Sequence, residues 1–156
     1  MENAVYEKLM RCYKTVKEKV DFQPKVALVL GSGLGDYADR MEIEAELDYH
    51  DIDGFPVSTI PGHKGRFVFG HVGEVPVVVM QGRVHYHEGY SIQDVVLPVR
   101  LLRTLAVAVV FLTYAAVGLN YEFHADAVSP TLIRLGSSVA SPLLSPTTVV
   151  LVLRSQ

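Results

Sequence analysis

The sequence predicts an α/β protein with a mixed β-sheet, and three features of its apolar pattern carry this prediction. Short, continuously apolar runs such as Val26–Leu30 are typical of strands buried on both faces. The N-terminal segment has apolar residues at helical spacing. Two further apolar runs flank the turn Val72-Gly73-Glu74, which predicts an antiparallel hairpin. At 156 residues, one domain covering residues 1–156 is expected.

The first half of the chain is predicted to alternate between helix, strand and loop. Apolar residues recur at helical spacing up to Val20, and Pro24 follows shortly after the end of that pattern. We expect a helix at Ala4–Val20, a buried strand at Val26–Leu30, and a turn at Gly31–Gly35 that leads into a short helix near Leu34. An exposed strand at Ile43–Tyr49 and a loop at Asp51–Lys64 should follow, and then a hairpin of Arg66–Gly70 with Val75–Met80.

The second half begins with a helix start signal. Ser91 and Asp94 have the spacing of a capping box, with Asp in place of the usual Glu, so a helix should run from here toward Thr104. Pro98 should kink this helix. Strands are expected at Val107–Leu112 and Ala127–Ile133, and the run Val149–Leu153 is predicted to be a short strand without an obvious partner.

Two polar segments follow predicted strands and together suggest an anion site. The turn Gly31–Gly35 follows one strand, and Arg83 and His85 follow another. Ligands of open α/β sheets collect at the carboxyl ends of strands, where backbone N–H groups, a guanidinium and an imidazole would suit phosphate. The alternatives are a simple glycine turn and an exposed polar pair. A metal site formed by His85, His87 and Glu88 is a further alternative.

Composition excludes several classes of function. The net charge of −3 argues against a nucleic-acid surface, and the single cysteine, Cys12, excludes an intrachain disulfide and a cysteine metal cluster. No signal peptide is apparent, and the apolar stretch 105–119 is too short for a membrane span, so we expect a cytoplasmic protein.

Charge is distributed unevenly along the chain. Residues 105–156 contain four of the 31 charged side chains (14 basic plus 17 acidic), which leaves 27 in residues 1–104. A surface normally carries more charge than the C-terminal part could supply. We therefore expect this part to be buried, or to be covered by another chain or by a segment absent from this sequence, and predict a homo-oligomer.

Between Val26 and Leu105 the chain resembles the trimeric purine nucleoside phosphorylases, the family specific for 6-oxopurine nucleosides. The motifs that carry the resemblance are Gly31-Ser32-Gly33-Leu34-Gly35, Phe55-Pro56, Ser58-Thr59, Pro61-Gly62-His63, Gly65-Arg66, Val68-Phe69-Gly70, Met80-Gln81-Gly82-Arg83, His85, Glu88-Gly89-Tyr90 and Pro98-Val99-Arg100. The resemblance implies a phosphorylase/hydrolase-like α/β fold with a central mixed sheet flanked by helices. It also implies a trimer, inorganic phosphate as co-substrate, and neither metal nor other cofactor.

The resemblance implies a role for six residues. His85 and His63 would be catalytic, and Ser32, Arg83, His85 and the backbone of Ala115 would bind phosphate. His87 falls where a sugar-contacting Tyr often lies. The implied reaction is phosphate-dependent cleavage of the N-glycosidic bond of inosine or guanosine, which yields the purine base and ribose 1-phosphate.

The similarity weakens after residue 105, and residues 106–156 are diverged. The family pattern Leu-Thr-Asn-Ala-Ala-Gly-Gly-Ile-Asn is replaced by Leu112-Thr113-Tyr114-Ala115-Ala116-Val117-Gly118-Leu119-Asn120. Tyr114 thus replaces an active-site Asn, and no residue here matches the family's purine-binding groups. The alternative hypothesis is therefore a catalytically inactive, truncated or engineered derivative with an incomplete α/β fold that retains a phosphate or sulfate pocket.

Overall fold

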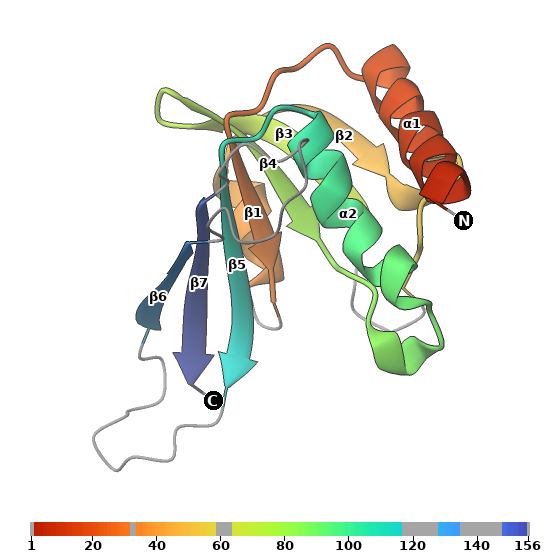
Figure 1. Cartoon of the computed structure of the whole chain (residues 1–156). Coiled ribbons are helices and arrows are strands. Elements are labelled where there is room, and N and C mark those ends of the chain that lie inside the picture. The colour runs from red at the N-terminus through yellow and green to blue at the C-terminus, as the bar shows by residue number, and fades with distance from the viewer. Residues whose placement is uncertain (1, 32–33, 59–63, 117–127, 135–147, 156) are drawn as a thin grey trace.

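The computed structural model describes residues 2–31, 34–58, 64–116, 128–134 and 148–155, and these residues form one mixed sheet with helices on it (Figure 1). The sheet has seven strands in the order β2-β3-β4-β1-β5-β7-β6. β1 pairs in parallel with β4 and β5, and β5 in parallel with β7, whereas β2-β3-β4 and β6-β7 are antiparallel. The predicted fold class is confirmed. The strands are β1 (Val26–Leu30), β2 (Glu42–Asp48), β3 (Arg66–Val72), β4 (Val75–Gln81), β5 (Val109–Ala116), β6 (Val128–Arg134) and β7 (Thr148–Ser155).

Two α-helices and three short 3₁₀ helices complete the described structure. They are α1 (Glu2–Lys19), α2 (Ile92–Thr104), η1 (Gly35–Arg40), η2 (Tyr49–Asp51) and η3 (Tyr86–Glu88). α1 and α2 lie side by side against the sheet (Figure 1). Within the described residues, no helix has the length and apolar character needed to cross a membrane.

The core explains why the central strands are apolar without interruption. Phe67 and Phe69 of β3 belong to the larger core cluster with residues of α1 and α2, whereas Val68 between them belongs to a second cluster with Ala38 of η1. Successive side chains of a strand point to opposite faces, so both faces of β3 and β4 are covered.

Three details differ from the expectations. The strand predicted to lack a partner is β7, which pairs on one side with β5 and on the other with β6. Tyr49, predicted to lie in an exposed strand, comes after the end of β2 and is only 1% exposed. The strand predicted to begin at Val107 begins at Val109.

The start of α2 is held as the sequence indicates. The Ser91 hydroxyl accepts a hydrogen bond from the Asp94 backbone N–H (3.1 Å), and the helix continues through Pro98 to Thr104. Lys8 of α1 lies 2.6 Å from the Asp94 carboxylate, which ties the two helices together. Hydrogen bonds from Lys8 and Ser91 hold the pKa of Asp94 below its ordinary value.

Gly70 of β3 lies where the backbone of β2 comes closest, beside the register shift between Ile43 and Ala45. A Cβ at position 70 would lie 2.1 Å from the backbone carbonyl oxygen of Glu42. We expect Gly70→Ala to lower the free energy of unfolding by about 1–3 kcal/mol or more, because the backbone of one strand must move. Urea denaturation monitored by circular dichroism measures this change.

The matched control is Gly35→Ala, because a Cβ at position 35 would meet no atom within 4 Å. This variant should stay within about 0.5 kcal/mol of the unsubstituted protein. Equal stabilities for the two variants would contradict the close approach at Gly70.

Candidate functional site

Three parallel strands end at the same edge of the sheet and bring the predicted polar segments together. Leu30 at the end of β1 lies opposite Gln81 at the end of β4, and Val29 lies opposite Leu112 of β5. The residues after these positions therefore leave the sheet as neighbours, and β1, β5 and β7 point the same way (Figure 1). Gly31 and Arg83, which the sequence placed after two separate strands, thus belong to one strand-end site.

Thr113 of β5 links the three strand ends. Its hydroxyl accepts a hydrogen bond from the Gly31 backbone N–H (2.8 Å) and donates one to the Val29 carbonyl (2.8 Å). The Thr113 carbonyl accepts a hydrogen bond from Nη1 of Arg83 (3.1 Å). Thr113 therefore fixes the start of the glycine turn relative to the guanidinium.

Arg83 is partly buried, which favours an anionic ligand. Burial lowers the pKa of its guanidinium from the ordinary value, since desolvation disfavours the cation. Besides the bond to Thr113, its Nε lies 3.4 Å from Nε2 of His85. A partly desolvated guanidinium gains most from a ligand that carries negative charge and several acceptor oxygens.

His85 is oriented by Glu88, whose side chain is only 3% exposed. One carboxylate oxygen, Oε1, accepts the His85 backbone N–H at 2.7 Å and lies 3.0 Å from Nδ1 of the same residue. The other oxygen accepts the Ser58 hydroxyl (3.0 Å). An ionised carboxylate only accepts hydrogen bonds, so it favours the tautomer with the proton on Nδ1 and leaves Nε2 as an acceptor facing Arg83.

The remaining predicted site residues are distributed as follows. His87 is exposed, and its ring stacks on that of His85 with centroids 5.0 Å apart. Ala115 lies on β5, which continues past Leu112, the last residue it pairs with β1. Ser32 and His63 lie outside the described residues.

The alternative metal site finds no support in this geometry. Among the residues that the structure describes, no three His, Cys, Asp or Glu side chains come together as metal ligands. Glu88, one of the three proposed ligands, instead accepts hydrogen bonds from His85 and Ser58.

Sequence reasoning missed three residues that organise the site. Thr113 was treated only as a residue of the diverged family pattern, Glu88 only as a motif residue or metal ligand, and Gln81 only as a motif residue. A usable signal exists for two of them. Gln81 ends the apolar strand β4, and Thr113 follows the apolar run Val109–Leu112 within β5. Both are buried and polar, and such groups need specific partners.

Comparison with known proteins assigns the family. The family model described as "Phosphorylase superfamily" matches residues 25–131, which include all three strand ends of the site. The chain belongs to the phosphorylase superfamily. Within this superfamily, the chain is 40% identical over 140 residues to purine nucleoside phosphorylase 1 of Bacillus subtilis, covering 90% of this chain and 52% of the relative. It is 41% identical over 125 residues to the purine nucleoside phosphorylase of Rattus norvegicus, covering 80% and 43%.

A solved structure from the same superfamily has the same fold. The Schistosoma mansoni purine nucleoside phosphorylase in complex with inosine superposes with a TM-score of 0.72 at 31% identity, covering 80% of this chain and 43% of that one. The resemblance to purine nucleoside phosphorylases is thereby confirmed. This superfamily member spans about half the length of the curated relatives it matches.

Proposed function

We propose that this chain is a purine nucleoside phosphorylase-type protein. The reaction would be phosphate-dependent cleavage of the N-glycosidic bond of inosine or guanosine, giving the purine base and ribose 1-phosphate. The observation that carries the proposal is the convergence of the Arg83 guanidinium and the Glu88-oriented His85 imidazole, 3.4 Å apart, at the strand ends. The relatives named above, including one solved with inosine, support the substrate class.

Phosphate would be bound by Ser32, Arg83, His85 and the Ala115 backbone. Arg83 supplies a planar fork that matches two phosphate oxygens. Nε2 of His85 can accept the hydrogen of a bound hydrogenphosphate, which leaves more negative charge on the oxygens that face the sugar. His63 would act at the same phosphate, and His87, whose ring stacks on His85, would contact the sugar.

Catalysis would follow from electrostatics and alignment. A phosphate oxygen forms a bond to the anomeric carbon while the bond from that carbon to the purine nitrogen breaks, and the bonding electrons leave with the purine, which takes up a proton. Positive charge develops on the ribosyl group in the transition state. An anion held beside it by Arg83 and His85 stabilises that charge, and binding in line removes the entropy cost of encounter.

The proposal extends to organisation and partners. Residues 1–156 would form a single domain. The pairing of β1, from the family-like part (1–105), with β5, from the diverged part (106–156), supports this. The partners would be a purine nucleoside and phosphate, with no nucleic acid and no membrane. The charge-poor stretch 105–156 supports a homo-oligomer, and the resemblance supports a trimer. A cytoplasmic location remains a prediction.

Two measurements on the purified 156-residue protein test the proposal. Isothermal titration calorimetry should show saturable binding of inorganic phosphate, and hypoxanthine release from inosine, coupled to oxidation of the base, should require phosphate. No side chain of this chain is assigned to the purine, and loss of one such donor costs about 10²–10³ in rate. The release rate should therefore lie at least that far below the Bacillus subtilis relative assayed in parallel.

The outcomes separate the two hypotheses stated for this sequence. Absence of phosphate binding would contradict the proposed function. Phosphate binding with no release of hypoxanthine at any enzyme concentration would favour the catalytically inactive derivative.

A further inference from the structure

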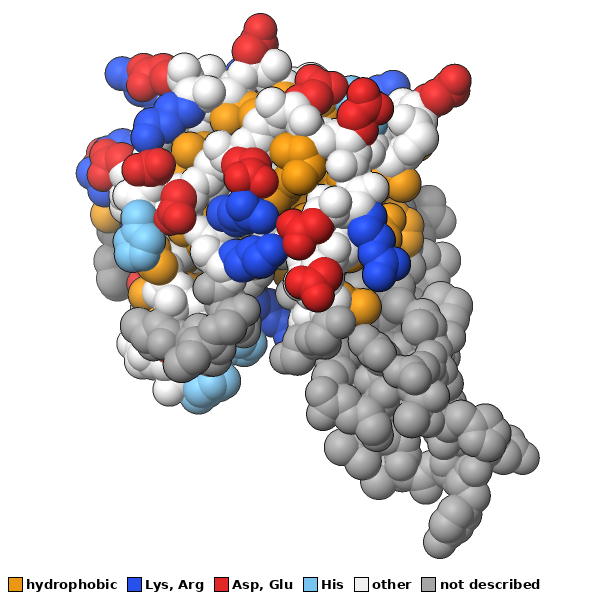
Figure 2. Space-filling view, turned by 180° about the vertical axis from the view of Figure 1, so that it is seen from behind, with side chains coloured by type: hydrophobic (Ala, Val, Ile, Leu, Met, Phe, Trp, Pro, Cys, Tyr) orange, Lys and Arg blue, Asp and Glu red, His pale blue; other side chains and the backbone are white. Residues whose placement is uncertain are grey.

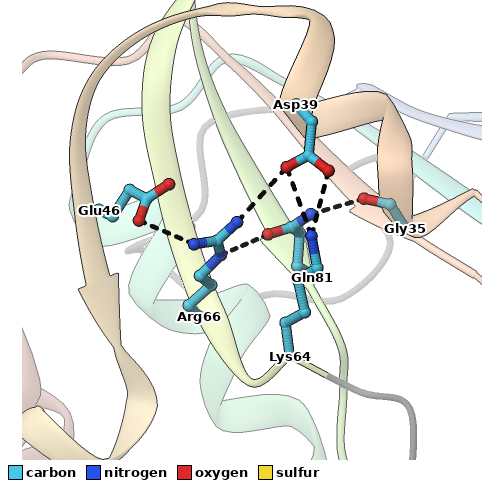
Figure 3. A network of polar contacts seen from close by, with 6 residues as sticks. All are labelled: Gly35, Asp39, Glu46, Lys64, Arg66 and Gln81. Carbon is cyan, nitrogen blue, oxygen red and sulfur yellow. Dashed lines mark hydrogen bonds and ion pairs between the residues drawn. The ribbon is translucent and has the colours of Figure 1, made fainter.

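The side-chain amide of Gln81 bridges the glycine turn and the sheet (Figure 3). Gln81 is the last residue of β4 and is 2% exposed. Its Nε2 donates to the Gly35 carbonyl at 2.5 Å, and its Oε1 accepts from Nε of Arg66 at 2.6 Å. Gly35 both ends the glycine turn and begins η1. A buried side chain thus fixes the backbone where that turn ends.

The orientation of this amide is determined by its neighbours. Arg66 has only donors, so the amide oxygen must face it, and the amide nitrogen then faces the Gly35 carbonyl. A flipped amide would place two donors together at Arg66 and two acceptors together at Gly35. Arg66 therefore controls the bond to Gly35 without touching Gly35 itself.

Arg66 is held by acidic side chains from two further elements. Its Nη1 donates to Glu46 of β2 at 2.7 Å, and its Nη2 lies 3.5 Å from the carboxylate of Asp39 in η1. Lys64 lies 3.1 Å from the same Asp39 carboxylate. Basic and acidic side chains are interspersed on the face seen in Figure 2. The guanidinium uses its three nitrogens on three elements, an arrangement that a lysine ammonium cannot copy.

The other side of the bridge is equally fixed. The Gln81 carbonyl accepts the Gly65 N–H (2.8 Å), and the buried Tyr49 hydroxyl donates to the carbonyl of Gly82 (2.8 Å). Burial raises the pKa of Tyr49 well above its ordinary value, which keeps this hydroxyl a donor. The segment immediately before Arg83 is therefore anchored to the sheet.

We propose that Arg66 and Gln81 are positioning residues that hold Gly35, and with it the end of the glycine turn, at a fixed place relative to Arg83. Their effect on phosphate binding rests on the function proposed above. Their effect on the backbone at Gly35 does not.

The decisive variant is Gln81→Glu. The carboxylate keeps and strengthens the contact to Arg66 but cannot donate to the Gly35 carbonyl, so the bridge is cut at one bond. Hydrogen–deuterium exchange of the peptide covering residues 34–41 should become about threefold to tenfold faster, as expected for loss of one hydrogen bond. The dissociation constant for inorganic phosphate should rise by a similar factor.

The matched control is Glu44→Gln, which removes the carboxylate that lies 2.7 Å from Nδ1 of His71, also between β2 and β3, without touching the bridge. Exchange at 34–41 and phosphate affinity should not change in this control. Arg66→Lys is a second test that keeps the positive charge. It should reproduce the faster exchange at 34–41 because an ammonium cannot contact Glu46, Asp39 and Gln81 at the same time, which weakens the hold on the Gln81 amide.

Three results would overturn the positioning role. They are unchanged exchange at 34–41 in both Gln81→Glu and Arg66→Lys, acceleration spread equally over β3 and β4, and the same acceleration in Glu44→Gln. Because the exchange measurement needs no ligand, it decides the positioning role even if the unsubstituted protein fails to bind phosphate, which would instead refute the proposed function.

Discussion

Replacing Arg83 by Ala is expected to weaken the binding of inorganic phosphate about ten- to hundredfold. The guanidinium lies beside His85 and Thr113, and its burial lowers its pKa, so it is a partly desolvated cation poised for an anion. A hydrogen bond to a charged group is worth about 1.5–3 kcal/mol, which gives this range of dissociation constants. Isothermal titration calorimetry with phosphate measures the effect, and phosphate-dependent hypoxanthine release should fall at least in parallel.

Arg11→Ala is the control for this experiment. Arg11 is on the exposed face of α1, with a side chain 58% exposed and 3.6 Å from Asp53. This substitution also removes a guanidinium, but one on α1 rather than at the strand ends, and it should leave the affinity for phosphate unchanged. If Arg83→Ala bound phosphate as tightly as Arg11→Ala, the guanidinium would have no part in the anion site.

Replacing Glu88 by Ala is expected to damage both stability and phosphate binding. The change removes the carboxylate that accepts hydrogen bonds from the His85 backbone N–H and the Ser58 hydroxyl and that lies 3.0 Å from Nδ1 of His85. A hydrogen bond to a charged group is worth about 1.5–3 kcal/mol, so the loss of these contacts should lower the free energy of unfolding by at least about 1.5 kcal/mol. Urea denaturation gives this value, and Glu74→Ala in the exposed β3–β4 turn is the matched control.

Glu88→Gln separates the orientation of His85 from the stability of the fold. Glutamine has nearly the same shape but no charge, so the preference for a proton on Nδ1 weakens. Nitrogen NMR of the imidazole should show a smaller population of the Nδ1–H tautomer, together with weaker phosphate binding. An unchanged tautomer with unchanged phosphate affinity would show that Glu88 is needed for folding alone.

Local patterns in the sequence predicted most of the strands and the antiparallel β3–β4 hairpin, but not how the other strands pair. The central runs are apolar because both faces are covered, and this signal is visible in Val26–Leu30 without any structure. Residues 149–153 have an equally clear strand pattern. Their partners, β5 and β6, were not predictable because pairing depends on chain path rather than on local composition. Tyr49 was misplaced for a similar reason, since alternation alone does not show where a strand ends.

The residues of the candidate site also fall into those that local sequence predicts and those that depend on how the strands pair. Arg83 and His85 were predicted as a pair because residues two apart in an extended segment have side chains on the same face. In the structure Nε of Arg83 lies 3.4 Å from Nε2 of His85. Thr113 was missed because its importance comes from register. It lies just past the point where β5 runs beside β1, and only that alignment brings its hydroxyl to Gly31. Interactions across 82 residues of chain leave little trace in the pattern around either residue.

The central position of β1 has a consequence for how this chain is made. Among the described strands β1 is synthesised first, yet its neighbours are β4 and β5, which end at residues 81 and 116. Until both have been synthesised, the apolar run 26–30 has at least one open edge of unpaired N–H and C=O groups. Nascent chains that stall before residue 109 would therefore expose an unpaired apolar strand, so the risk of aggregation during synthesis persists until β5 has been made.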